Sequence, residues 1–205
     1  MEFIERELPG VIVIEPAVFH DDRGFFLETY HAEKFTAKGI NVRFVQDNHS
    51  RSCRGTIRGL HAQRTRPQGK LVRAVAGAVS DVVVDIRRGS PTYLRWLSVE
   101  LSSDNFRQIY VPPGYAHGIC VLSEFAEIEY KCTDFYDPSD ELRILWSDPE
   151  IAISWPLKEP ILSPKDCAAP MLAEQLDSLP LWSDSKMRGS AFSFTQPVQV
   201  SNDPS

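Results

Sequence analysis

The middle of the chain is a series of short strand-like segments, and this pattern limits the folds that the chain can adopt. Between Thr56 and Leu145, apolar and β-branched segments alternate with Gly, Pro, Ser-Asp and Asp-Pro turn signals. The segments are residues 56–61, 70–76, 78–86, 95–101, 107–111, 117–122, 126–132 and 141–146. Evenly spaced short strands without a long helical period are typical of a β-sandwich or a small barrel. We therefore expect an all-β fold.

The N-terminal part adds two strand patterns and one short helix. Residues 11–14 form a β-branched run, and a turn signal at residues 20–24 precedes a second strand at residues 25–30. Residues 31–38 favour a short helix that ends at Gly39.

Length and composition favour one domain. The chain has 205 residues with 15 prolines and 11 glycines, which is enough for a single core and suits a turn-rich β protein. After about Leu181 the sequence becomes rich in Ser, Gly and Pro and its periodicity is weak. We expect one domain over residues 1–181 and a flexible or packed tail over residues 182–205.

The sequence carries no sign of secretion or membrane insertion. Acidic residues occupy the N-terminus where a signal peptide needs positive charge, and no apolar run approaches the roughly 18 residues of a membrane helix. The four cysteines are scattered without a C-x-x-C pair, so we expect them to be reduced and mostly packed. A cytoplasmic protein is the expectation.

Residues 51–73 form a basic stretch in an otherwise acidic protein. The stretch has seven basic residues and no acidic one, whereas the net charge of the chain is −6. These residues are Arg51, Arg54, Arg58, Arg64, Arg66, Lys70 and Arg73. The contrast favours a small anion as ligand, because a polyanion partner would favour basic charge overall. His61 lies among these charges and marks a candidate site, with a solvated basic face as the plain alternative.

Residues 113–118 resemble half of the cupin signature P-x-G-x-x-H. Metal-binding cupins also carry a His-x-His pair and a Glu on an earlier strand, which completes the metal ligands. The corresponding strand here has His61-Ala62-Gln63, with a single histidine. We therefore expect no metal, and a metal-dependent oxygenase or isomerase becomes a minor alternative.

Several motifs in one order carry a more specific resemblance. They are Asp22-Arg23-Gly24, Gln46-Asp47-Asn48, Arg58-Gly59-Leu60-His61, Gln68-Gly69-Lys70-Leu71-Val72, Val84-Asp85-Ile86-Arg87, Gly89-Ser90-Pro91-Thr92, His117-Gly118, Tyr130-Lys131-Cys132-Thr133, Trp155-Pro156 and Ser163-Pro164-Lys165-Asp166. Over about residues 1–170 the chain resembles the dTDP-4-dehydrorhamnose 3,5-epimerases, which are cupin-type dTDP-sugar epimerases. The resemblance implies a cupin-type jelly-roll β-sandwich with a few short helices, a dTDP-sugar substrate and no cofactor. It also implies a homodimer with exchanged N-terminal strands.

The chemistry of such an epimerase needs three groups. A base removes the proton next to a ketone, a cation or donor stabilises the enolate, and an acid returns a proton on the opposite face. His61 is the obvious base, Lys70 or a nearby Arg the enolate stabiliser, and Tyr130 the acid. The resemblance implies the same roles. It places the carboxylate that orients His61 at Asp166, with Asp85 as a second candidate.

The resemblance also implies a set of substrate-binding residues. They are Arg23, Glu28, Gln46, Asp47, Asn48, Arg58, His117, Tyr136, Glu141 and Lys165. Arg23 and Glu28 would reach the ligand from the exchanged strand of a partner subunit. Arg58 would lie near the diphosphate, and the ring of Tyr136 would stack on the base.

Three positions depart from the expected pattern. Ala62 replaces an aromatic residue that usually follows the histidine, and Leu94 replaces a usual glycine. Arg58 and His61 differ in strand parity, so a regular strand would point them to opposite faces. A β-bulge at Gly59 would bring both to one side, and we predict that bulge.

Other functions are compatible with the same fold. A C3-only epimerase or a 3,4-ketoisomerase of a dTDP-deoxysugar pathway would use the same base and acid. A non-catalytic nucleotide-sugar-binding cupin is a further alternative. The presence of His61, Lys70 and Tyr130 together argues against it, because a binding protein needs no acid and base on opposite faces.

Overall fold

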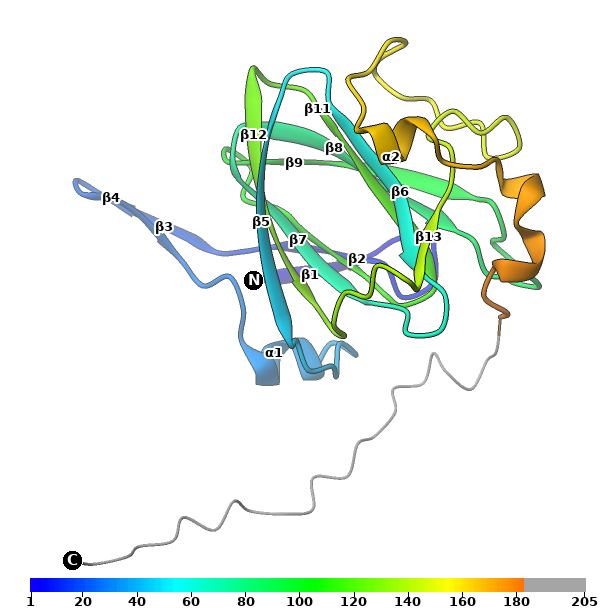
Figure 1. Cartoon of the computed structure of the whole chain (residues 1–205). Coiled ribbons are helices and arrows are strands. Elements are labelled where there is room, and N and C mark those ends of the chain that lie inside the picture. Colours follow the sequence, from blue (N-terminus) through cyan, green and yellow to red (C-terminus); the bar gives the residue numbers. More distant parts are fainter. Residues whose placement is uncertain (183–205) are drawn as a thin grey trace, which may run out of the picture.

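Two antiparallel sheets packed face to face form the body of the protein (Figure 1). The computed structural model describes residues 1–182. The first sheet has the strand order β1-β2-β10-β7-β12-β5. Its strands are β1 (Glu2–Glu5), β2 (Ile12–Glu15), β10 (Gln108–Val111), β7 (Lys70–Ala76), β12 (Phe125–Cys132) and β5 (Gln46–Cys53).

The second sheet faces the first and has the order β13-β6-β11-β8-β9. Its strands are β13 (Glu141–Arg143), β6 (Ile57–Gln63), β11 (Tyr115–Val121), β8 (Ala78–Asp85) and β9 (Trp96–Ser102). The expected all-β, cupin-type sandwich is confirmed, and the eight strand segments predicted between Thr56 and Leu145 all correspond to strands.

Strand β8 is buried on both faces because apolar layers lie on both sides of its sheet. Val83 packs into the core between the two sheets, together with Val72 and Ile109. Val82 and Val84 point the other way into an outer apolar cluster. This alternation is the period-two pattern of a β-strand.

The chain after β13 covers that outer face. Leu172 and Leu179 belong to the outer cluster, and the short elements here are α2 (Pro164–Cys167) and the 3-10 turns η1 (Leu172–Glu174) and η2 (Leu176–Ser178). Helix α2 contacts β6. This packing brings the C-terminal part of the described chain beside the strand that carries His61.

A two-stranded hairpin projects from the body of the protein (Figure 1). It consists of β3 (Val18–Asp21) and β4 (Gly24–Leu27), and α1 (Ala32–Thr36) follows it. Three large apolar side chains on it are mostly exposed: Phe19 at 64%, Phe25 at 57% and Phe26 at 70%. The hairpin thus exposes an apolar surface to solvent.

Some boundaries differ from those predicted. The strand predicted at residues 25–30 ends at Leu27, and strands β1, β3 and β5 were not predicted. The predicted helix is shorter, at Ala32–Thr36. Apart from Trp182, the predicted tail lies outside the described residues, and the single domain over residues 1–181 stays a prediction.

The cysteine prediction is half right. All four cysteines are free, Cys120 and Cys132 are buried, and Cys53 and Cys167 are exposed. Within residues 1–182, no helix is long and apolar enough to cross a membrane.

Candidate active site

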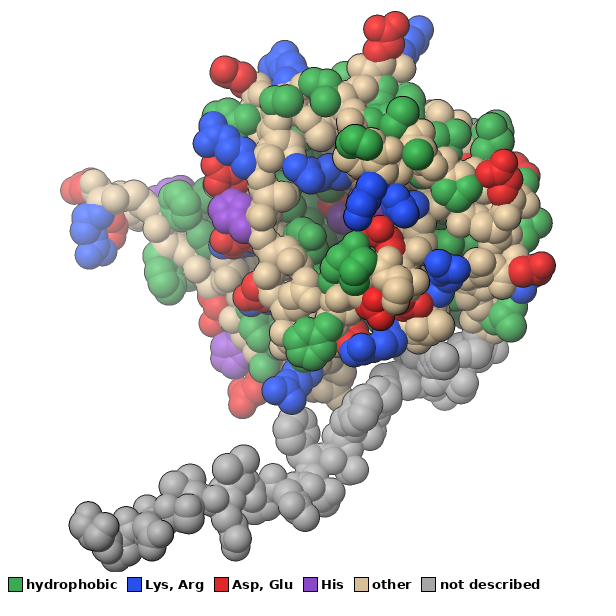
Figure 2. Space-filling view, in the orientation of Figure 1, with side chains coloured by type: hydrophobic (Ala, Val, Ile, Leu, Met, Phe, Trp, Pro, Cys, Tyr) green, Lys and Arg blue, Asp and Glu red, His purple; other side chains and the backbone are tan. Residues whose placement is uncertain are grey.

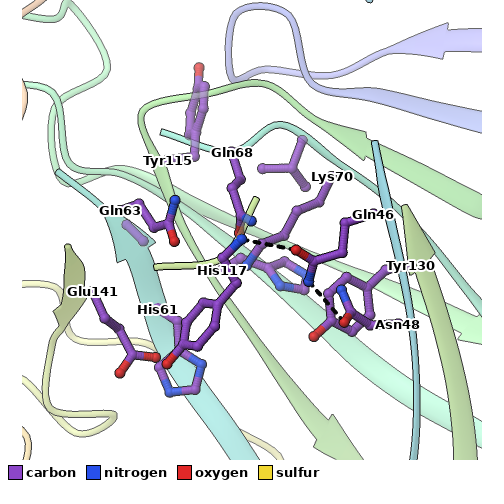
Figure 3. A pocket seen from close by; sticks show the side chains of 13 residues that line it. Gln46, Asn48, His61, Gln63, Gln68, Lys70, Tyr115, His117, Tyr130 and Glu141 are labelled. Atoms are coloured by element: carbon purple, nitrogen blue, oxygen red, sulfur yellow. Dashed lines mark hydrogen bonds between the residues drawn. The ribbon is translucent and has the colours of Figure 1, made fainter. Parts of the chain in front are cut away.

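A cavity of about 250 Å³ lies between the two sheets (Figure 3). Figure 2 shows Lys and Arg side chains gathered around a hollow in the face that is in view. The expected site residues that line the cavity are His61, Lys70, Tyr130, His117, Gln46, Asn48, Tyr136 and Glu141. The fold thus brings together residues that are up to 95 positions apart in the sequence, from Gln46 to Glu141.

His61 forms a short hydrogen bond with the carboxylate of Asp166. The distance from His61 Nε2 to Asp166 Oδ1 is 2.6 Å. Ser163 caps helix α2 and donates its hydroxyl to Asp166 Oδ2 at 2.8 Å. Burial alone would raise the pKa of Asp166, but the hydrogen bonds from His61 and Ser163 and the charge of His61 hold it below its usual value. An ionised carboxylate only accepts, so Nε2 carries a proton, and in the neutral imidazole Nδ1 is the basic nitrogen.

Asp85, the second candidate for orienting His61, has other partners. Its carboxylate is fully buried and accepts from Arg87 Nη2 at 2.7 Å, from Ser90 Oγ at 2.5 Å and from Thr92 Oγ1 at 2.6 Å. These bonds satisfy Asp85 within its own loop. The structure therefore excludes it as the partner of His61.

The bulge predicted at Gly59 is confirmed. His117 pairs with His61 and Ile119 pairs with Arg58, so β6 has one residue more than β11 between these pairs. Gly59 has a φ of +127°, and a Cβ atom there would lie 2.6 Å from the Cα of Gly118. Only glycine fits such a conformation so close to the neighbouring backbone.

Because of this bulge, Arg58 lies near the catalytic candidates. Its positive charge opposes the rise that burial causes in the pKa of Tyr130, and it adds to the lowering of the pKa of Asp166. Its Nε donates to Ser52 Oγ at 2.9 Å, which anchors the guanidinium beside β5. Arg58 is not among the residues that line the cavity, so it contributes a charge at the edge of the site.

Tyr130 and Lys70 come from the sheet opposite His61. Burial raises the pKa of Tyr130, so its hydroxyl keeps its proton at neutral pH. Burial lowers the pKa of Lys70, although Cys132, Asp81 and Glu141 oppose this shift. The Nζ atom of Lys70 lies 6.0 Å from the centre of the Tyr130 ring. A basic nitrogen on one wall and an acidic hydroxyl on the other suit proton removal and return on opposite faces of a ligand.

A second histidine–carboxylate pair lies at the same cavity. His117 Nε2 is 2.8 Å from Asp81 Oδ2, and the Asp81 side chain is fully buried. A buried Asp in so apolar a strand needs a partner, and His117 provides it. The sequence did not indicate Asp81 as part of the site, because the pairing of β11 with β8 creates this contact.

With this geometry established, comparison with known proteins identifies the family. The sequence profile described as dTDP-4-dehydrorhamnose 3,5-epimerase matches residues 5–174. The dTDP-4-dehydrorhamnose 3,5-epimerase of Pseudomonas aeruginosa is 57% identical over 168 residues, which cover 81% of this chain and 93% of the relative. The chain belongs to the dTDP-4-dehydrorhamnose 3,5-epimerase family. It is therefore an isomerase of the carbohydrate-epimerase class.

Solved structures in the dTDP-4-dehydrorhamnose 3,5-epimerase family share the fold. The dTDP-6-deoxy-D-glucose-3,5-epimerase of Legionella pneumophila, in complex with dTDP-4-keto-L-rhamnose, is 48% identical and superposes with a TM-score of 0.86 over 89% of this chain and 98% of that chain. The Bacillus anthracis enzyme with TDP and PPi bound is 44% identical, with a TM-score of 0.81 over 83% of this chain and 99% of that chain. A dTDP-4-dehydrorhamnose 3-epimerase of Streptomyces niveus is 43% identical over 173 residues, covering 83% of this chain and 84% of the relative.

Successive side chains of β5 point to opposite faces of the sheet, so only some of the binding residues that the family resemblance implies face the cavity. Gln46 and Asn48 point into the cavity, where Gln46 Nε2 donates to Asn48 Oδ1 at 3.0 Å (Figure 3). Asp47 points to the outer face and accepts from Lys131 Nζ at 2.8 Å. Asp47 therefore does not reach the cavity of its own chain, contrary to the expectation that the three residues act together.

Arg23 and Glu28 also lie away from the cavity of their own chain. Arg23 is on the projecting hairpin and forms an ion pair with Asp21, while Glu28 accepts from Lys34 Nζ at 2.7 Å. Lys165 follows the N-cap of α2 and is exposed, next to Asp166 but outside the lining of the cavity.

The two unusual positions have different explanations. Ala62 lines the cavity and also packs against the outer apolar cluster. Leu94 has a φ of +62°, a left-handed conformation that glycine adopts more readily than leucine. Among residues 1–182, no group of three or more His, Cys, Asp or Glu side chains could hold a metal ion.

Proposed function

We propose that this epimerase inverts C3 and C5 of dTDP-4-dehydro-6-deoxy-D-glucose to form dTDP-4-dehydro-L-rhamnose. The observation that carries the proposal is that His61, on one sheet and paired with Asp166 of α2, lies across the cavity from Tyr130 on the facing sheet. This arrangement supplies a base and an acid on opposite sides of a sugar ring. The Pseudomonas aeruginosa and Legionella pneumophila relatives are named as 3,5-epimerases.

Each inversion needs two proton transfers. Nδ1 of His61 takes the proton from the carbon next to the C4 ketone, and the electron pair moves into an enolate. The imidazolium that forms is stabilised by Asp166, and the enolate oxygen accepts a hydrogen bond from Lys70. Tyr130 then gives its hydroxyl proton to the opposite face of the same carbon. Solvent returns the proton to Tyr130, and His61 loses its proton to solvent.

Lys70 suits this task because its donors are unused. Within the described residues the ammonium group of Lys70 forms no hydrogen bond or ion pair, and burial in the cavity lowers its pKa. A cation in a poorly solvated site interacts more strongly with a developing oxyanion than a solvated one does.

The nucleotide lies at the mouth of the cavity in this proposal. Tyr136 stacks on the base, Gln46 and Asn48 contact the nucleotide, and Arg58 approaches the diphosphate. His117, Glu141 and Lys165 complete the ligand contacts. The exposed ring of Tyr136 and the cationic rim support this orientation of the ligand.

We also propose a homodimer in which the hairpin of one subunit packs on the other. The exposed rings of Phe19, Phe25 and Phe26 support this arrangement, because such a surface is unfavourable in water. Arg23 and Glu28 would then enter the partner's site. Sedimentation velocity would test the dimer, and Phe26→Ser is expected to shift it toward monomer. A monomeric wild-type protein would contradict the exchange.

The activity is tested by hydrogen exchange in D₂O with dTDP-4-dehydro-6-deoxy-D-glucose, followed by proton NMR. Deuterium at both C3 and C5, lost in His61→Ala, is the expected result. Deuterium at C3 alone would establish a 3-epimerase, the alternative that the Streptomyces niveus relative favours. Binding without any exchange would show a non-catalytic protein and refute the proposal. The absence of a cofactor and the cytoplasmic location stay predictions.

A further inference from the structure

Gln63 occupies the position where a metal-binding cupin has its second histidine. It follows His61 by two residues on β6 and lines the same cavity. Only 4% of the residue is exposed. A buried carboxamide must have partners for its two donors and its acceptor. Those partners show what the Gln63 amide holds in place.

The Gln63 amide bonds to the backbone on both sides of Tyr136. Its Nε2 donates to the carbonyl of Phe135 at 3.2 Å and to the carbonyl of Arg66 at 2.7 Å. Its Oε1 accepts from the backbone N–H of Asp137 at 2.7 Å. The peptide groups before and after Tyr136 are thus held by one side chain from the strand of His61.

Tyr136 depends on this backbone support. The segment around it is outside any strand or helix, 45% of the residue is exposed, and it belongs to none of the apolar clusters. Its own N–H donates to Gln46 Oε1 at 2.9 Å. Packing therefore contributes little to the position of the ring. The two glutamine side chains fix the backbone that carries it, and a side-chain hydrogen bond with Glu141 holds its hydroxyl end.

A second attachment holds the same loop farther from Tyr136. The buried carboxylate of Asp140 accepts from the backbone N–H groups of Thr65 and Arg66, at 3.0 Å and 2.9 Å. Asp140 does not bond to the peptide groups that flank Tyr136. The two attachments can therefore be separated by mutation.

We propose that Gln63 is a positioning residue that holds Tyr136 over the nucleotide end of the site. Gln63 thereby sets the affinity for the base and not the rate of proton transfer. The inference rests on the proposed function in one respect, namely that Tyr136 contacts the nucleotide.

The test is a double-mutant cycle with dTDP as the ligand, measured by isothermal titration calorimetry. Gln63→Glu keeps the acceptor and removes both donors, and Gln63→Asn keeps the amide but shortens its reach. Each is expected to weaken dTDP binding roughly tenfold, comparable to loss of a stacked base. In a Tyr136→Ala background the same changes are expected to alter the dissociation constant less than about twofold, because no ring is left to position. The kcat at saturating sugar nucleotide is expected to stay within about twofold of wild type.

Controls make the outcomes decisive. Asp140→Asn loosens the same loop without touching the residues that flank Tyr136, so its loss of affinity is expected to be several-fold smaller. Equal losses in Asp140→Asn and Gln63→Glu, or independent effects of Gln63 and Tyr136, would overturn the inference. If Gln63→Glu does not fold, Gln63→Asn carries the test. If the wild type shows no hydrogen exchange but the Gln63 and Tyr136 substitutions still weaken dTDP binding in a coupled way, the proposed function is refuted and this inference stands.

Discussion

Replacing Asp166 by asparagine isolates the electrostatic contribution of the carboxylate to catalysis. The substitution keeps the shape of a buried side chain that accepts from His61 Nε2 at 2.6 Å and from Ser163 Oγ at 2.8 Å. It removes one negative charge next to the imidazole. When His61 takes a proton from the substrate, the resulting imidazolium loses the anion that stabilises it.

The expected loss follows from Coulomb's law. Two unit charges about 4 Å apart interact by roughly 4 kcal/mol at an effective dielectric constant of about 20. The side chain of His61 is 31% exposed, whereas that of Asp166 is 5% exposed. Solvent screening on the histidine side reduces the estimate to about 2–3 kcal/mol. This corresponds to a fall in kcat of roughly 30- to 150-fold.

The assay is the rate of deuterium incorporation at C3 and C5 at saturating substrate, with KM from the same data. We expect KM to change less than about threefold, because the stabilising charge acts only once the proton has moved. Asp85→Asn is the matched control, since it breaks a buried pair with Arg87 away from His61. That variant should lose about 3–5 kcal/mol of folding stability and keep its kcat per folded molecule. A kcat for Asp166→Asn within fivefold of wild type would refute the reasoning.

Three further predictions follow from the same structure. Gly59→Ala should lower the free energy of unfolding by about 2 kcal/mol or more in urea denaturation, because its Cβ would meet the backbone of Gly118 at 2.6 Å. Gly24 has a similar φ of +130° but no atom within 4 Å of the position that a Cβ would take, so Gly24→Ala should lower the free energy of unfolding less. Lys70→Met should reduce kcat about 100-fold or more without loss of stability, and a fall in kcat below tenfold would exclude Lys70 as the enolate stabiliser. Burial alone would raise the pKa of Asp85, but hydrogen bonds from its neighbours lower it. The stability that this carboxylate adds is therefore present above the ordinary carboxyl pKa of about 4 and is lost as pH falls through the lower folded value. The urea midpoint should drop as the pH falls below about 4, and less steeply in Asp85→Asn.

The strands from β6 to β13 were predictable because each has at least one apolar face. Strand β5 was not, because neither of its faces is apolar. Gln46 and Asn48 face a polar cavity, while Asp47 and His49 face outward. Strand propensity depends on the surface against which side chains pack, so a strand that lines a polar site resembles a loop in sequence.

The predicted hairpin strand illustrates a second limit. The strand was predicted over residues 25–30, yet it ends at Leu27. Tyr30 instead packs against Phe35 of α1, with ring centres 4.8 Å apart. A local pattern does not show where tertiary contacts end a strand.

By itself the sequence determined the fold class, the family and the residue types of the site, because period-two patterns and ordered motifs are properties of the chain alone. It also indicated the bulge at Gly59, since the parity of Arg58 and His61 required one. Only the tertiary structure decided between Asp166 and Asp85, placed Tyr130 opposite His61 and gave Gln63 its partners. The reason is physical: a carboxylate, a hydroxyl or an amide acts on the groups within about 3 Å of it, and those groups come from strands and loops that meet only when the two sheets pack.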